Sequence, residues 1–281
     1  MKRFWKNANG RLKFGLIVTL IFLIIGFGIY FIPHTDPFPQ VIKEENVAMF
    51  TNGHILGTTA LGQDIFWLFI EAVHNSLSIG LIVAALGTVV GVLVGLIAGF
   101  VGGTLDRVLM VITDTFVVIP SLPVLIMMTS LMKGSSGSTV IMLAIVLALF
   151  AWAWPSRQIR SMALTMKERD FINTAKFSGE GTLQIVVTEI LPFALTWSLS
   201  NFMNATLSAI GSESSLAVLG LSPANLVSLG NMIQWARDRN AILQGRWNWI
   251  LPPIIGTIIL FVGLFMLITG YNDYTSMKRG K

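Results

Sequence analysis

Long runs of apolar residues alternate with short polar segments along this chain of 281 residues. A helix needs about 20 apolar residues to cross the roughly 30 Å hydrocarbon core of a bilayer. Six runs reach or approach that length, and we predict a spanning helix for each: residues 14–32, 77–101, 108–132, 138–156, 190–211 and 249–271. The pattern therefore predicts an all-α, polytopic membrane protein.

Composition and charge placement agree with this prediction. Charged residues make up 12% of the chain, about half the share found in soluble domains. With a cytoplasmic N-terminus, fourteen of the 19 Lys and Arg residues fall in cytoplasmic segments, as the positive-inside rule requires. We therefore predict a multi-pass protein of the cell membrane with both termini in the cytoplasm. This topology explains the net charge of +5 without a nucleic-acid partner.

The sequence offers little material for catalysis. It contains no cysteine, and no Gly-x4-Gly-Lys-[Ser/Thr] loop that would cradle the phosphates of ATP. The pair Glu71 and His74 has a spacing used in di-iron sites, but its second copy is missing. We therefore predict no catalytic residue, metal site or cofactor in this chain. Ionisable residues near the middle of the spans are almost absent, which disfavours ion-coupled secondary transport.

A stripe of small residues occupies one face of the second predicted span. Small side chains at intervals of three or four residues let helix backbones approach closely in lipid. We favour this packing interpretation, while a role in lining a pore stays open. The stripe consists of Gly80, Ala84, Gly87, Gly91, Gly95, Gly99 and Gly102.

A second stripe, in the fifth predicted span, consists of uncharged polar residues. Such groups form hydrogen bonds between helices, or line a wet path for a polar solute. The sequence leaves both interpretations open. The stripe comprises the candidate path residues Ser200, Asn201, Asn204, Ser208 and Ser212.

The polar island 168–192, on the cytoplasmic side, predicts a short projecting helix at about 168–178. Asp170 is the expected N-cap, and Gly179 the left-handed residue that ends the helix. We expect Phe171 and Ile172 to form an exposed apolar tip that fits a groove in another protein. The candidate contact residues are Glu168, Arg169, Asp170, Phe171, Ile172, Asn173, Thr174, Ala175, Lys176 and Gly179.

This island resembles the cytoplasmic loop of ABC importer permeases, which reads Glu-Ala-Ala-x3-Gly and then Leu-Pro. Ala175, Gly179 and the pair Leu191-Pro192 match, whereas Asn173 and Thr174 depart from the pattern.

Other segments resemble the dipeptide/oligopeptide permeases, and favour the second permease of the pair. They include "LGTTALGQD" before the second span, "GGTLDRVLMVITDTFVVIPSLPVLI", and the outer segments "SESSLAVLGLS" and "GRWNWILPP". The likeness runs from about residue 13 to the C-terminus.

The resemblance implies a type I ABC importer permease fold and several partners in the lipid bilayer. These are a homologous permease forming a heterodimer, two ATPase subunits that bind ATP and Mg²⁺, and an extracytoplasmic solute-binding protein. The helix at 168–178 would then be the coupling helix. The implied solute is a peptide, with oligosaccharides or nickel chelates as alternatives. From a different class, a stand-alone channel or a secondary transporter is the alternative.

Two features are expected in the segment outside the membrane between the fifth and sixth spans: a short amphipathic helix around Leu226–Ala236, and interfacial anchoring by Trp247 and Trp249.

The expected organisation of the chain follows from these assignments. The expected segments are an N-terminal segment with the first helix at 1–32, an extracytoplasmic segment at 33–75, a permease core at 76–271 with a coupling loop at 157–190 and an outer loop at 212–248, and a cytoplasmic tail at 272–281.

Overall fold

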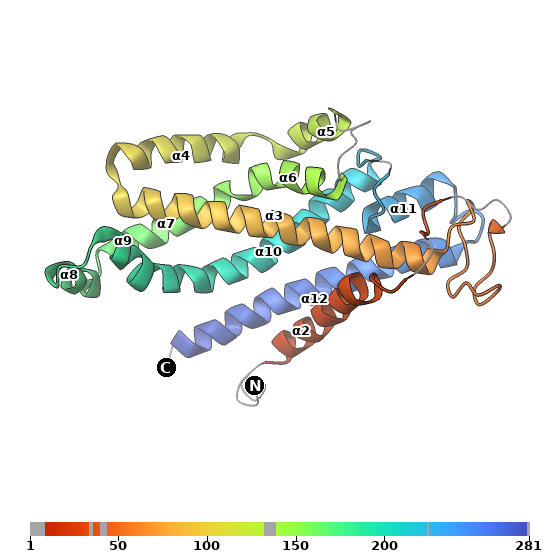
Figure 1. Ribbon diagram of the computed structural model, residues 1–281, viewed down its shortest axis with the longest axis horizontal. Coiled ribbons are helices and arrows are strands. Elements are labelled where there is room, and N and C mark those ends of the chain that lie inside the picture. The colour runs from red at the N-terminus through yellow and green to blue at the C-terminus, as the bar shows by residue number, and fades with distance from the viewer. Residues whose placement is uncertain (1–8, 34–35, 40–43, 132–138, 224, 280–281) are drawn as a thin grey trace. The chain divides into compact units, whose positions relative to one another are not determined.

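The computed structural model describes residues 9–33, 36–39, 44–131, 139–223 and 225–279. The β-structure in these ranges is limited to two isolated β-bridges, Thr51–His54 and Thr58–Asp64. The all-α prediction is confirmed. The helical elements (Figure 1) are α2 (Gly10–Leu23), η1 (Ile24–Ile29), α3 (Ile65–Val101), α4 (Gly103–Val118), α5 (Ser121–Leu131), α6 (Thr139–Ala151), α7 (Ala153–Lys167), α8 (Asp170–Phe177), α9 (Thr182–Ile185), η3 (Val186–Ile190), α10 (Leu191–Val218), α11 (Leu229–Asp238) and α12 (Trp247–Arg279).

Three helical stretches in the described ranges are long and apolar enough to cross a membrane: Gly10–Ile29, Ile65–Val101 and Trp247–Ser276. Two bent pairs, α4 with α5 and α6 with α7, raise the number to five if each pair is one span. The fifth predicted span corresponds to α10, whose 28 residues extend about 42 Å. Its Ser and Asn residues keep it below the same hydropathy requirement, so the count of six spans stays a prediction.

Helix α3 begins at Ile65, twelve residues before the predicted start of the second span. Polar residues in this added stretch interrupt the apolar run, which is why the sequence pattern missed it. Their side chains find hydrogen-bond partners on other segments. The Nδ1 of His74 lies 2.7 Å from the carbonyl oxygen of Gly26, and Asn75 donates to the carbonyl of Val227 at 2.8 Å.

The predicted span 108–132 is broken rather than straight. Helix α4 ends at Val118, Ile119 is extended with φ −62° and ψ 124°, and α5 begins after Pro120 at an angle of 80°. Proline disfavours helical geometry in the residue before it and lacks the N–H of a helix interior. Pro120 therefore accounts for the break.

The chain divides into two compact units, to both of which α3, α5, α6 and α10 contribute residues. Unit 1 comprises residues 1–80, 126–143 and 207–281, and unit 2 comprises residues 81–125 and 144–206.

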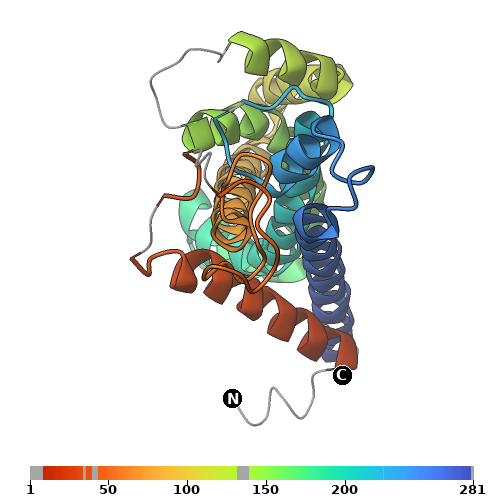
Figure 2. The ribbon, with the colours of Figure 1, turned by 90° about the vertical axis from the view of Figure 1, so that its right-hand side faces the viewer.

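In unit 1, α2 packs along α12 (Figures 1 and 2) at places where both helices carry glycine. A side chain at Gly15 would collide with the backbone of α12, and one at Gly270 with the backbone of α2. Gly263 makes room in the same way for Val18. Close backbone approach of this kind is how small residues join helices in lipid.

In unit 2, four glycines of α3 lie against α6 and α7. A Cβ on Gly87, Gly91, Gly95 or Gly99 would meet atoms of these helices within 2.8 Å. The packing interpretation of the small-residue stripe is confirmed for these four. Gly102 differs, because it has no neighbour within 4 Å and adopts φ +74° where the chain turns into α4.

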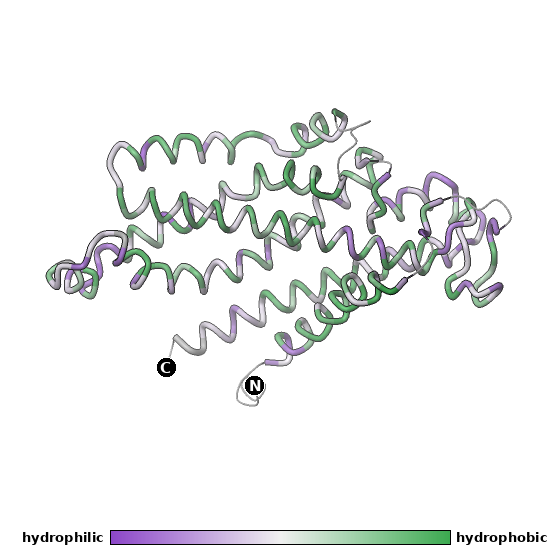
Figure 3. The backbone as a smooth tube through the Cα atoms, in the orientation of Figure 1, coloured by the Kyte–Doolittle hydropathy of each residue, from purple (hydrophilic) through white to green (hydrophobic). Residues whose placement is uncertain are grey.

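Hydropathy varies strongly between the elements (Figure 3). Helices α3 and α12 are hydrophobic over most of their length, whereas the segment around α8 carries many hydrophilic residues. The polar island therefore coincides with a distinct structural element.

Candidate functional site

The predicted short helix in the polar island is present as α8. It follows a turn after α7 and begins at Asp170, which is thus the first helical residue and not the N-cap that we expected. The difference is one position, and the Asp170 carboxylate still lies in the first turn, where the helix dipole favours negative charge. The helix ends at Phe177, one residue before the predicted end.

One face of α8 is buried in unit 2. Ile172 is fully buried and Ala175 is 8% exposed, three residues apart on the same face. They belong to an apolar cluster with residues of α3, α7, α9, η3 and α10. This cluster, here called the inner cluster, contains Val92, Leu96, Phe100, Ile159, Ala163, Ile172, Ala175, Ile185, Ile190 and Ala194.

The expected exposed tip is therefore half wrong. Ile172 is an anchor that holds α8 onto unit 2, so its side chain is not available to a partner. Phe171 is 39% exposed, and its ring stacks at 6.3 Å on that of Phe193. Phe177, which our sequence analysis did not select, is 90% exposed at the end of α8. On a helical projection of the sequence, Phe177 lies opposite the face that carries Ile172 and Ala175, and this position could have predicted its exposure.

Most other candidate contact residues are exposed to solvent. Arg169 and Glu168 lie in the turn before the helix, while Asn173 and Thr174 lie on its outer face. The side chain of Lys176 is outside the described part of the structure. The exposed residues of α8 and of the turn before it thus combine charged, polar and aromatic side chains.

The end of α8 has the predicted glycine geometry. Gly179 adopts φ +84°, and the N–H of Glu180 donates to the carbonyl of Ala175 at 3.1 Å. This is the hydrogen bond of a Schellman motif, in which a left-handed residue closes the helix. The prediction for Gly179 is confirmed, and the motif redirects the chain into α9.

Charged side chains fix α7, the helix that leads into α8, to neighbouring helices. Arg160 on α7 donates two hydrogen bonds to Asp106 on α4, from Nε at 2.5 Å and from Nη2 at 2.7 Å. Lys167, the last residue of α7, donates to the carbonyl of Phe100 at 2.7 Å and lies 5.5 Å from its ring centre. A bidentate Arg–carboxylate pair fixes geometry as well as charge. Helices α3, α4 and α7 are therefore joined where the loop leaves them.

The candidate path residues on α10 do not share one environment. Asn201 is 6% exposed and donates to the Thr88 hydroxyl at 3.1 Å, so it joins α10 to α3. Asn204 and Ser208, one turn apart, are exposed, while Ser200 and Ser212 are half-buried. The packing interpretation therefore holds for Asn201. The exposed pair keeps the path interpretation as a prediction.

The elements after α10 confirm one prediction and correct another. The amphipathic helix is present as α11, with Ser228 as its N-cap accepting from the N–H of Asn231. Trp247 is 55% exposed, as an interfacial anchor requires, but Trp249 is 2% exposed and packs in the core of unit 1. Trp249 is thus a core residue, in the same apolar cluster as Leu229, Met232 and Ala236 of α11.

The sequence model of one family covers two thirds of the chain. It is described as the binding-protein-dependent transport system inner membrane component, and it matches residues 91–278. The chain belongs to this family, and the predicted resemblance to ABC importer permeases is confirmed. It is therefore a permease, a membrane component of a transport system that depends on a binding protein.

Two relatives show how far this similarity extends. An oligopeptide transport system permease protein OppC from Mycobacterium tuberculosis is 30% identical over 264 residues, covering 92% of this chain and 87% of the relative. One of the same name from Lactococcus lactis subsp. lactis is 28% identical over 252 residues, covering 89% of this chain and 85% of the relative. The similarity thus includes segments before residue 91, where the family match begins.

Proposed function

We propose that this permease is one half of an ATP-driven importer for peptides, and that α8 is its coupling helix. The other half is a homologous permease. Two cytoplasmic ATPase subunits bind ATP and Mg²⁺ and perform the hydrolysis, and an extracytoplasmic binding protein delivers the peptide. Both termini of this chain lie in the cytoplasm, on the side of the ATPases.

The single observation that carries this proposal is the two-faced packing of α8. Its inner face, Ile172 and Ala175, is fixed in the inner cluster, and its outer face presents Phe171 and Phe177. A helix that is anchored on one side and exposes two aromatic side chains on the other suits a groove in a second protein. An ATPase subunit that moves such a helix would move α3 and α7 with it.

The peptide assignment is supported by the relatives, both of which are named oligopeptide permeases. The resemblance left oligosaccharides and nickel chelates open as solutes of similar permeases. The ligand that co-purifies with the binding protein, identified by mass spectrometry, distinguishes these three. A sugar or a nickel chelate in place of a peptide rejects the peptide assignment and leaves the ATP-driven mechanism standing.

The coupling role is tested on the complex purified in lipid nanodiscs. Phe177→Ala should lower the amount of ATPase subunit that co-purifies, because the most exposed apolar side chain of α8 is removed. Thr182→Ala is the matched control, since Thr182 is also exposed in the loop but lies outside α8. If no ATPase subunit co-purifies with the unmodified permease, the alternative of a stand-alone channel or secondary transporter is favoured.

A further inference from the structure

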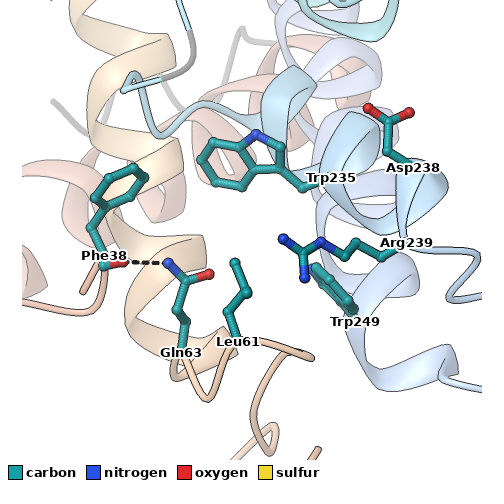
Figure 4. Close-up of a pocket in the computed structure, with 7 residues that line it drawn as sticks. All are labelled: Phe38, Leu61, Gln63, Trp235, Asp238, Arg239 and Trp249. Atoms are coloured by element: carbon teal, nitrogen blue, oxygen red, sulfur yellow. Dashed lines mark hydrogen bonds between the residues drawn. The ribbon is translucent and has the colours of Figure 1, made fainter. Parts of the chain in front are cut away.

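A cavity of about 360 Å³ opens in unit 1 between the segment that precedes α3 and the segment from α11 to the start of α12. Figure 4 shows the side chains around it. Cavities that hold small ligands begin at about 300 Å³ and combine apolar walls with a few polar groups. The residues that line this cavity are Phe38, Leu61, Gln63, Trp235, Asp238, Arg239 and Trp249.

The walls of the cavity are aromatic and held in place. The rings of Phe38 and Trp235 lie 6.0 Å apart between centroids, and Trp249, which also lines the cavity, is 2% exposed. The amide of Gln63, itself buried, donates to the backbone carbonyl of Phe38. This bond ties the segment that carries Phe38 to the turn before α3. The hydrogen bond thus helps to fix the position of Phe38 beside Trp235.

Arg239 supplies a positive charge that the neighbouring acid does not neutralise. The carboxylate of Asp238 accepts from the Arg237 guanidinium at 3.1 and 3.2 Å and from the Gln234 amide at 3.0 Å. In Figure 4 Asp238 points away from the cavity, whereas the Arg239 guanidinium points into it, towards Leu61. Within the described ranges, Arg239 forms no ion pair.

We propose that this cavity binds the carboxyl-terminal residue of a peptide, with its α-carboxylate on Arg239 and its apolar side chain against Phe38 and Trp235. A guanidinium pairs with a carboxylate through two parallel hydrogen bonds, and it also stacks on aromatic rings. In a peptide terminus the carboxylate and the side chain are attached to one carbon, so a single residue meets both features of the cavity. The inference rests on the proposed transport of peptides, and gives this permease a solute site of its own.

The test uses the complete complex in nanodiscs, without binding protein, and two probes that differ only in charge. These are the tripeptide Ala-Ala-Phe and its carboxyl-terminal amide, and binding is measured by saturation-transfer NMR of the peptide. We expect the free acid to bind about ten times more tightly than the amide. That ratio corresponds to about 1.4 kcal/mol, close to the lower end of the range for hydrogen bonds to charged groups.

Variants then assign the binding to the cavity. Arg239→Gln should weaken binding of the free acid about tenfold and leave the amide unaffected. Arg246→Gln is the matched control, because it removes the same charge from the same outer segment, and Arg246 does not line the cavity. Trp235→Ala should weaken both probes, since it removes part of the apolar wall.

Equal binding of acid and amide, or an unchanged affinity in Arg239→Gln, overturns the proposal. A complex that binds neither peptide also overturns it. If Arg239→Gln in that case weakens association with binding protein added in a separate experiment, the cavity holds a side chain of that protein instead. These results are independent of ATPase co-purification and of the ligand found on the binding protein. A failure of the cavity proposal is thus distinguishable from a failure of the proposed function.

Discussion

Gly179 allows a sharp test of how α8 is connected to the rest of the permease. Its φ of +84° lies in the left-handed region, and no atom lies within 4 Å of the position that a Cβ would take. A Cβ there would have open space around it, so we expect the effect of valine to come mainly from the backbone. Left-handed geometry costs an L-residue roughly 1–2 kcal/mol. The closed end of α8 would therefore be less populated by a factor of about 5 to 30.

Two further variants separate this effect from the loss of glycine as such. Asn tolerates the left-handed region, so Gly179→Asn should retain most of the wild-type behaviour. Gly181 also has open space around it but no positive φ, so Gly181→Val should be close to wild type. All three variants change the same short turn, but only Gly179→Val places a β-branched residue at a position that requires left-handed backbone geometry.

The assay is the ratio of peptide imported to ATP hydrolysed, in proteoliposomes that contain the complete complex and the binding protein. We expect Gly179→Val to lower this ratio several-fold while ATP hydrolysis continues, because the ATPases would move a helix whose link to α9 is loosened. A wild-type ratio in Gly179→Val would refute the reasoning. An equal loss in Gly181→Val would show that the turn needs small residues rather than left-handed geometry.

Three other predictions concern packing, charge and the path. Ile172→Ala should cost about 2–5 kcal/mol and lower the Tm of the permease in nanodiscs without ATPase subunits, measured by scanning fluorimetry, whereas Phe177→Ala should leave that Tm unchanged because its side chain is exposed. Asp106→Asn removes the bidentate carboxylate partner of Arg160. Because the pair is only partly exposed, the change should cost about 1–3 kcal/mol and lower the Tm. The double variant Asp106→Arg, Arg160→Asp, which exchanges the two residues, should partly restore the Tm. Asn204→Leu should reduce peptide uptake several-fold without a change in Tm, and unchanged uptake would favour a packing role.

The sequence predicted where α8 lies but not which of its faces is buried. Apolar residues occur on both sides of this short helix, with Ile172 and Ala175 on one side and Phe177 on the other. Periodicity alone cannot choose between them in eight residues, because the choice depends on which face matches the neighbouring helices. The contact of Ile172 with the inner cluster decides it. The glycine that ends the helix was predictable because its backbone requirement is local.

In the long helices, too, features with a local cause were predictable from the sequence, and features that depend on distant contacts were not. Their apolar centres were evident from composition, yet the start of α3 at Ile65 was not, because His74 and Asn75 look like loop residues until their distant partners are known. The break at Pro120 has a local cause, but its 80° angle does not. The cavity beside Arg239 was missed altogether, since its walls come from segments almost 200 residues apart.

The glycines of α3 that face α6 and α7 have a mechanical consequence. Gly87, Gly91, Gly95 and Gly99 recur every four residues, which corresponds to about 6 Å along a helix axis. A slide shorter than this repeat would press the side chains of α7 onto the larger residues between the glycines. We therefore expect the contact to resist small axial displacements, so that α3 and α7 would move together if α8 were displaced.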